Sequence, residues 1–256
     1  NVGTYTSTAS CSSVAQGQKL CSNYTLTSAT KQYTITKSAS SLSLSPASGT
    51  LTYGTNATSA ITKTGDGTLS CTTSDSTVAT CSISGTTLTI TPVANTTDGK
   101  VATITVSLSA GSNYNATSAT YVATVNRQTI TCPSAPSAKT YSGVSQASGV
   151  TCPTGSTKGG TTASINAGTY SHTCSANSGY KFASACSVNW TINPKSIAVT
   201  WGTTVSFTYN GSAQAPTVTS PVAGVNSESL TLTRTTPGTN VGTYTSTASC
   251  SSVAQG

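Results

Sequence analysis

The chain has 256 residues, of which 6% are charged and 35% are hydrophobic, and its formal net charge is +7. Ordinary soluble domains carry about 25% charged residues, so hydroxyl groups must solvate most of this surface. The basic residues are scattered singly, which argues against nucleic-acid binding, because that needs a clustered basic face. No apolar run approaches the ~20 residues that span a bilayer, so we expect no membrane insertion in this segment.

Composition favours an ordered β protein over a disordered chain. Thr, Val, Ile and Tyr suit the half-buried surface of a pleated sheet. Disordered segments usually combine low hydrophobicity with high net charge, whereas this chain has many aliphatic positions and nine cysteines. We therefore expect folded strands.

The first seventeen residues predict how the chain is organised. Residues 1–17 recur without a change 239 residues later, as residues 240–256. Self-similarity at a fixed period is typical of repeat proteins. We interpret the chain as one period of a 239-residue tandem repeat plus a short overlap, so we do not expect its ends to be domain boundaries.

Three segments end in the same way and predict three domain junctions. Each alternates apolar and hydroxyl residues with a period of two, the pattern of a half-buried strand. A basic residue opens the next alternating segment each time: Lys37, Arg127 and Lys195. The predicted divisions are residues 1–37, 38–126, 127–194 and 195–256.

The two outer divisions are predicted to be parts of one kind of domain. Residues 1–37 would be its C-terminal part, which a copy of residues 195–239 completes. Residues 195–256 would be the N-terminal part of the next such domain. One period then holds three β domains, and short linkers between them would limit hinging.

Short strands and tight turns are predicted inside these divisions. Asp66-Gly67 and Asp98-Gly99 are tight-turn dipeptides, and residues 86–91 and 101–106 alternate like strands with one buried face. No long window shows the 3.6-residue period of a helix, so we expect almost no helix. Several short strands at this spacing predict a β-sandwich or a barrel.

The cysteines predict disulfides and hence an exported protein in an oxidising compartment. Neighbours in the sequence form couples: Cys11 with Cys21, Cys71 with Cys81, Cys132 with Cys152, and Cys174 with Cys186. The first two couples suit strands joined by a hairpin or a short loop, and each bridge should stabilise the fold by roughly 3 kcal/mol. Pairing among the last four stays open, because four cysteines allow three connectivities.

The ninth cysteine follows from the repeat. Cys250 is the copy of Cys11, so we expect its partner beyond the end of this chain. Zinc binding is the competing interpretation of the cysteines, but it needs closely spaced Cys or His ligands, and no such spacing occurs. We expect no metal and no cofactor.

The polar residues predict no catalytic chemistry, so we do not expect an enzyme. General acid–base catalysis usually needs paired carboxylates or an oriented histidine, yet the four carboxylates are scattered and two of them belong to turns. His172, the only histidine, is expected to face solvent or the adjoining hairpin. Calcium-stiffened linkers need carboxylates at the junctions, whereas the predicted junctions are basic. The carboxylates are Asp66, Asp75, Asp98 and Glu228.

Several short motifs resemble tandem Ig-like modules of large bacterial surface proteins and adhesins. Residues 209–216 followed by Asn240-Val241-Gly242-Thr243-Tyr244 resemble the MBG/YDG repeat type, and residues 139–143 with 166–170 resemble it again. Residues 38–126, with 76–80 and 113–116, resemble the bacterial Ig-like group. The resemblance implies an extended array of Ig-like β-sandwiches, and the paired cysteines, which many relatives lack, are expected to staple them.

The same resemblance implies a role in surface display, in a stalk or filament, or in an adhesin shaft. The expected partners are copies of the protein itself or the continuation of the same chain. Carbohydrate or mucin binding is the alternative, because exposed aromatic rings stack on sugars, and Trp201 and Tyr209 are the candidates. We expect Trp190 and Trp201 to serve the core instead.

Overall fold

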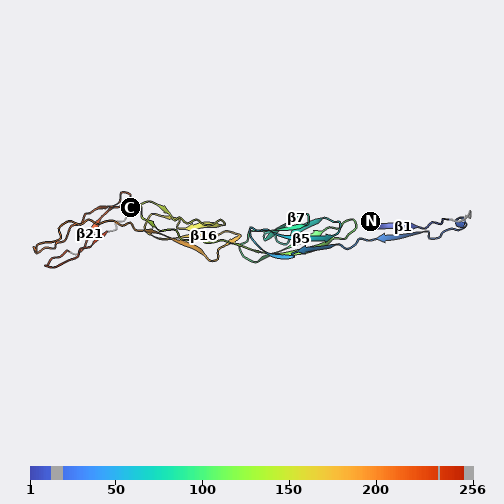
Figure 1. The fold of residues 1–256 in the computed structure, drawn as a ribbon, viewed down its shortest axis with the longest axis horizontal. Coiled ribbons are helices and arrows are strands. Elements are labelled where there is room, and N and C mark those ends of the chain that lie inside the picture. The colour runs from blue at the N-terminus through green and yellow to red at the C-terminus, as the bar shows by residue number, and fades with distance from the viewer. Residues whose placement is uncertain (13–19, 236, 251–256) are drawn as a thin grey trace. The chain divides into compact units, whose positions relative to one another are not determined.

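The computed structural model describes residues 1–12, 20–235 and 237–250. In this described part, β-strands account for nearly all regular structure, as predicted, and the one helix is the single 3-10 turn η1 (Leu20–Asn23) (Figure 1). Internal contacts divide the chain into two compact units, Asn1–Ile130 with Ala176–Ala183, and Thr131–Ser175 with Ser184–Gly256. A search of the described residues finds no helix long and apolar enough to cross a membrane.

The first unit begins with a two-stranded antiparallel sheet. Its strands are β1 (Gly3–Thr8) and β2 (Thr30–Ile35). Tyr5 lies opposite Tyr33, and the two rings stack with centroids 5.7 Å apart. Every residue of β2 is exposed, so this sheet has no buried face of its own.

Residues 41–126 form a β-sandwich of two four-stranded sheets. One sheet has the order β3-β5-β8-β7 and the other the order β4-β10-β9-β6. Their bounds are β3 (Ser41–Ser45), β4 (Ser48–Thr52), β5 (Ala57–Thr64), β6 (Leu69–Thr73), β7 (Ala79–Ser84), β8 (Thr87–Pro92), β9 (Lys100–Leu108) and β10 (Thr117–Asn126). This strand order is that of an immunoglobulin sandwich, so the predicted all-β Ig-like class is confirmed.

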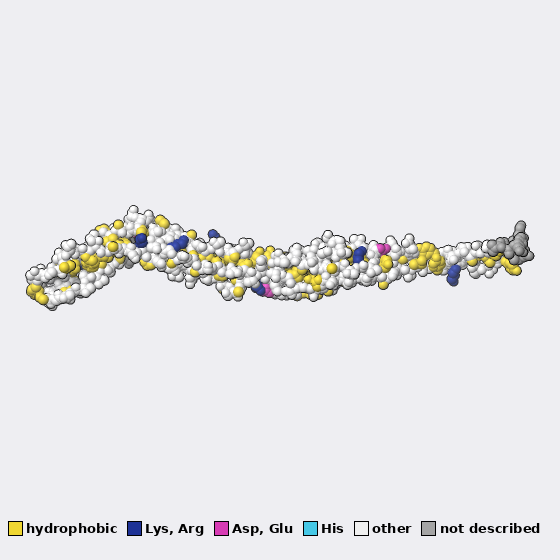
Figure 2. Space-filling view, in the orientation of Figure 1, with side chains coloured by type: hydrophobic (Ala, Val, Ile, Leu, Met, Phe, Trp, Pro, Cys, Tyr) yellow, Lys and Arg dark blue, Asp and Glu magenta, His cyan; other side chains and the backbone are white. Residues whose placement is uncertain are grey.

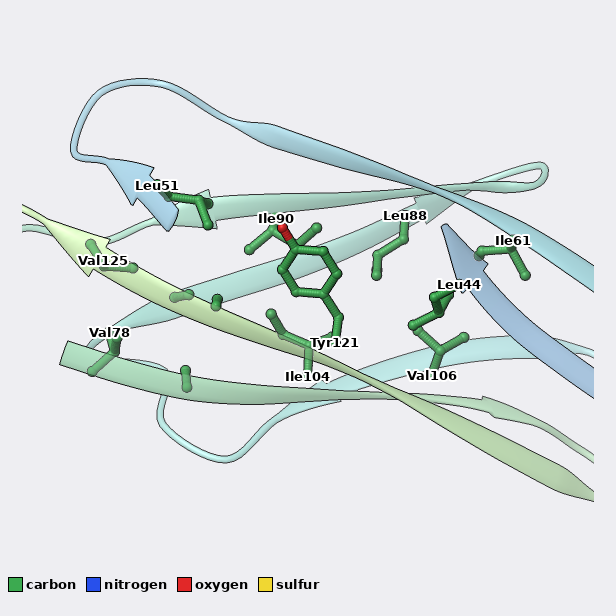
Figure 3. Packing of buried hydrophobic residues seen from close by; sticks show 13 residues of the cluster. Leu44, Leu51, Ile61, Val78, Leu88, Ile90, Ile104, Val106, Tyr121 and Val125 are labelled. Atoms are coloured by element: carbon green, nitrogen blue, oxygen red, sulfur yellow. The ribbon is translucent and has the colours of Figure 1, made fainter. Parts of the chain in front are cut away.

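The core of the sandwich lies between its two sheets. Alternate residues of β9 point inward and are buried, and Tyr121 of β10 packs among them with Ile90, Ile104 and Leu88 (Figure 3). The disulfide Cys71–Cys81 joins β6 to β7. These strands are connected by a short loop, as expected, but they belong to opposite sheets, so the bridge links the two layers.

The second unit contains a four-stranded sheet in the order β12-β18-β16-β14. Its strands are β12 (Lys139–Thr140), β14 (Ser156–Gly160), β16 (Gly168–Ala176) and β18 (Cys186–Asn193). Trp190 on β18 is buried, and its Nε1 donates a hydrogen bond to the carbonyl of Thr161 at 2.8 Å, so Trp190 serves the core as expected. Two small sheets pair β13 (Gln146–Ala147) with β15 (Ala163–Ser164) and, in the first unit, β11 (Gln128–Thr129) with β17 (Tyr180–Lys181).

Residues 195–250 contain little regular structure. Two short antiparallel pairs form there, with strands β19 (Val222–Ala223), β20 (Ser229–Leu230), β21 (Leu232–Arg234) and β22 (Ala248–Cys250). Isolated bridges join Trp201 to Val218 and Gln214 to Gly238. Cys250 is exposed at the end of β22, and residues 251–256 lie outside the described part.

The disulfides correct the neighbour-to-neighbour pairing within residues 127–194. Cys132 bonds Cys186, and Cys152 bonds Cys174. Cys174 and Cys186 lie directly opposite each other in the β16–β18 register, and both side chains point into the core, where each meets a cysteine from a segment outside the pair of strands. The expected bridge Cys11–Cys21 is present.

Candidate functional site: domain junctions and an open groove

An acidic side chain holds the junction between the sandwich and the segment that follows it. Asp98 lies in the turn before β9 and accepts hydrogen bonds from the backbone N–H of Arg127 at 2.8 Å and from Lys181 Nζ at 2.8 Å. The Arg127 guanidinium adds an ion pair at 3.4 Å. Lys181 above all, together with the N–H groups of Arg127, holds the pKa of the Asp98 carboxyl well below its usual range.

Aromatic packing reinforces this junction inside the first unit. The rings of Tyr53 and Tyr180 meet edge to face with centroids 5.4 Å apart. Gly179 lies so close to Tyr53 that an added Cβ would come within 2.4 Å of the ring, and its N–H donates to the carbonyl of Asn95 at 2.8 Å. These contacts join Tyr53 and Asn95 to residues 179–180 within the first unit.

The expectation of purely basic junctions is therefore wrong at Asp98. A carboxylate does lie there, and it forms ion pairs with the Lys181 ammonium and the Arg127 guanidinium. The junction at Lys37 differs, because Lys37 Nζ donates to the carbonyl of Gly111 at 2.8 Å. Beside it, the backbone N–H of Asn113 donates to Asp66 at 3.0 Å and lowers the pKa of that carboxyl.

The third predicted junction, at Lys195, lies within the second unit. The hydroxyl of Tyr141 donates to the carboxylate of Glu228, and this hydrogen bond raises the pKa of Tyr141. Lys195 and Val225 help to line a hollow of about 360 Å³ beside this pair. The remaining carboxylate, Asp75, accepts from the backbone and the hydroxyl of Thr77 within its own turn.

His172 is buried, which corrects the expectation that it faces solvent. It lies on β16 two residues from both Tyr170 and Cys174, so strand parity gives it their inward face, and only 2% of the residue is exposed. Its Nδ1 lies 2.7 Å from the Ser148 hydroxyl, and its Nε2 lies 3.7 Å from Cys152 Sγ. A disulfide sulfur has no proton, so in the neutral ring Nε2 donates to the sulfur and Nδ1 accepts from Ser148.

This cluster has the residue types of a metal site but not their chemistry. One ligand atom from each of Cys152, His172 and Cys174 lies within 4.8 Å of the others. The two sulfurs are bonded to each other, and only a thiolate binds metal as a cysteine ligand. The cluster therefore acts as a packed polar contact around a disulfide.

A groove of about 520 Å³ opens in residues 205–246. Phe207 and Tyr209 line one part of it, and Gly242 and Tyr244 line another. Tyr209 is 63% exposed. Trp201 is half-buried and is not among the lining residues of the groove, so the structure does not bring the two aromatic candidates together there.

Sequence reasoning missed Lys181 and Ser148. Lys181 lies 83 residues from its partner Asp98, and Ser148 lies 24 residues from its partner His172. A single sequence carries no signal for such distant contacts. Charged groups are sparse on the face shown in Figure 2, in agreement with the composition.

Known proteins resemble this chain only weakly. No family model matches the chain, the MBG/YDG and bacterial Ig-like types included, and no curated protein matches it. Among solved structures, the titin domains z1z2 in complex with telethonin match at 14% identity over 63% of this chain and 100% of that chain, with a TM-score of 0.27. A three-Ig structure of titin in a Glu-to-Ala variant matches at 8% identity over 65% and 70%, with a TM-score of 0.24. The Ig-like fold of residues 41–126 follows from their strand order.

Proposed function

We propose that this chain is a structural component of an extracellular filament, stalk or adhesin shaft built from a 239-residue tandem repeat of Ig-like domains. The observation that carries the proposal is the identical 17-mer at residues 1–17 and 240–256, because self-similarity at a fixed period is typical of repeat proteins. The proposal assigns the chain no catalytic step and no cofactor.

The junction at Asp98 supports a shaft rather than a flexible string of domains. Its carboxylate is bonded to Arg127 and to Lys181 at once, and Tyr53 packs against Gly179 and Tyr180. Within this proposal, such contacts stiffen the shaft at this point, and a load-bearing or protruding structure requires stiffness.

Four disulfides support a place outside the cell. Disulfides persist in oxidising compartments and are rare in the cytosol. The low charge content agrees with a surface solvated by hydroxyl groups. Within this proposal, the protein is exported and displayed at or beyond the cell surface.

Electron microscopy tests the proposal directly. Strands of about ten residues at 3.3 Å give a domain roughly 35 Å long, so one three-domain period should span on the order of 100 Å. We expect an antibody against the 256-residue protein to label surface filaments on unpermeabilised source cells, with that axial repeat in negative stain. Label confined to the cell interior, while pre-immune serum gives none, would contradict the proposal.

Carbohydrate binding is the second candidate, and the exposed ring of Tyr209 in the groove favours it. Sugars stack on exposed aromatic rings, and Tyr209 lies beside Phe207 and Tyr244. A glycan array probed with the whole protein tests this candidate. Binding that Tyr209→Ala abolishes and Tyr24→Ala leaves unchanged would support it, since Tyr24 is also largely exposed but lies in the first unit.

A further inference from the structure

The repeated 17-mer has a different structure at each end of the chain. Residues 3–8 form strand β1 and pair with β2. The same six residues at positions 242–247 form no strand. Because the sequences are identical, the cause lies in the surroundings, and the evident difference is the paired strand β2.

The intact sheet of the second unit shows what β2 corresponds to. β16 begins with Gly168-Thr169-Tyr170, as β1 begins with Gly3-Thr4-Tyr5. The two strand pairs share one register: Gly3 opposite Ile35 and Tyr5 opposite Tyr33, as Gly168 opposite Ile192 and Tyr170 opposite Trp190. β2 is therefore the counterpart of β18.

A second match identifies the other neighbour of that strand. Gln146 Nε2 donates to the carbonyl of Thr140 at 2.9 Å, and Gln214 Nε2 donates to the carbonyl of Thr208 at 3.0 Å. Each loop also turns at a glycine of positive φ, 72° and 76° respectively. Thr208 is thus the counterpart of Thr140, which lies in β12 and pairs in parallel with the end of β18.

These matches indicate that the groove lies at a position that a strand occupies in the intact sheet. In the intact sheet, β18 lies between β12 and β16. The counterparts of β12 and of the start of β16 are residues 207–208 and 242–247. Phe207 lines the groove on the first of these segments, and Gly242 and Tyr244 line it on the second. The groove therefore occupies the position that β18 fills in the intact sheet.

The burial of matching residues in β18 and β2 leads to the same conclusion. Trp190 and Ile192 of β18 are 2% and 0% exposed, whereas their counterparts Tyr33 and Ile35 are 49% and 44% exposed. Tyr33 and Ile35 lie two residues apart, so they share one face of β2. The exposed apolar face of β2 therefore matches the apolar rings of Phe207 and Tyr244 that line the groove.

We propose that β2 of a second copy of this chain fills the groove and completes the sheet by strand addition. Ile35 and Thr36 of that copy would run parallel to Phe207 and Thr208. Moving β2 from residues 3–8 to residues 242–247 should cost little free energy, because the two antiparallel partners have the same sequence. The inference rests on the proposed tandem array and adds the identity of the segment that joins successive copies.

Peptide binding to the whole 256-residue protein tests this inference. The probe is a fluorescein-labelled peptide of residues 24–37, which contains the β2 sequence and no cysteine. We expect saturable binding by fluorescence anisotropy, together with slower amide exchange by NMR at residues 207–209 and 242–247. A peptide with Tyr33→Ser and Ile35→Ser should bind about tenfold more weakly or worse, because it loses the apolar face.

Matched protein variants locate the site. Phe207→Ser should weaken peptide binding, whereas Val199→Ser should not, because Val199 is an exposed apolar residue outside the groove. Without peptide, the protein should form concentration-dependent oligomers that excess peptide disperses. Binding that ignores Tyr33 and Ile35, or no protection of residues 207–209, would overturn the inference. If the inference failed, filaments of the expected period would still support the proposed function. If the peptide bound specifically but no filaments were found, only the proposed function would be overturned.

Discussion

The hydroxyl of Tyr170 donates a hydrogen bond to the backbone carbonyl of Asn166, 2.7 Å away. The same bond joins Tyr5 to Asn1 at 2.6 Å, and Tyr244 to Asn240 at 3.0 Å. It forms whether or not the following residues have found a partner strand. The motif is therefore local, since each of these bonds spans only four residues.

Replacing Tyr170 by Phe removes this bond and keeps the ring against Trp190. We expect the free energy of unfolding of the second unit to fall by about 1 kcal/mol, the usual net value of one hydrogen bond. Urea unfolding followed by the fluorescence of Trp190, with Trp201 replaced by Tyr in every protein, measures it. Tyr209→Phe is the control, since that side chain is largely exposed, and an equal loss in both variants would contradict the prediction.

The two disulfides of the second unit should differ in their effect on stability. Cys132–Cys186 spans 54 residues and Cys152–Cys174 spans 22. Loop-closure entropy grows with the logarithm of loop length, so the longer bridge should stabilise by about 0.8 kcal/mol more. Each pair has one buried and one more exposed cysteine, which keeps the packing losses comparable.

Urea unfolding of the two double serine variants, without reductant, measures this difference. The Cys132→Ser, Cys186→Ser protein should unfold at the lower urea concentration. The reverse order would show that packing around Cys152 and Cys174 outweighs loop entropy.

Acid should release the Asp98 junction only at low pH. The pKa of Asp98 is lower in the folded protein than the ordinary value of 3.8, so its ion pairs contribute fully above pH 3.8 and are lost as the pH falls through the folded value. We expect the protection factors of the Gly179 and Ile130 amides to stay constant from pH 7 to pH 4 and then to decline. Both N–H groups bond within this junction.

Asp98→Asn should lower those protection factors at pH 7 and remove their decline in acid. Asp75→Asn is the matched control, because its carboxyl also has a lowered pKa but belongs to a separate turn. A decline that Asp98→Asn leaves unchanged would assign the acid sensitivity to another group.

Much of the fold could be predicted from local sequence patterns. Period-two alternation locates β8 and β9, because a strand with one buried face needs only neighbouring residues to specify it. Cys71 and Cys81 could be paired, since a short loop brings them together. The 17-mer predicts the repeat without any structural information.

Contacts between distant segments could not be predicted in the same way. Cys132 bonds Cys186 rather than its neighbour in the sequence, Cys152, and the spacing of cysteines does not encode which segments the fold brings together. The burial of His172 could have been predicted, since Tyr170, His172 and Cys174 alternate along one strand and therefore share one face. The groove could be matched to the position of a strand only by comparison with the intact sheet β12-β18-β16-β14.

The contact between Ser148 and His172 should stabilise the second unit. Both residues are 2% exposed, and Ser148 Oγ also accepts from the N–H of Val150 at 3.2 Å. Ser148→Ala leaves a buried imidazole nitrogen without its donor, which should cost about 1–3 kcal/mol. His172→Ala leaves a cavity as well and should cost about 2–5 kcal/mol. The double variant should lose less than the sum, by about 0.5–3 kcal/mol, because the same contact is removed twice. Urea unfolding of the four proteins, followed by Trp190 fluorescence, closes the cycle, and strictly additive losses would mean that the hydroxyl and the ring stabilise the domain independently.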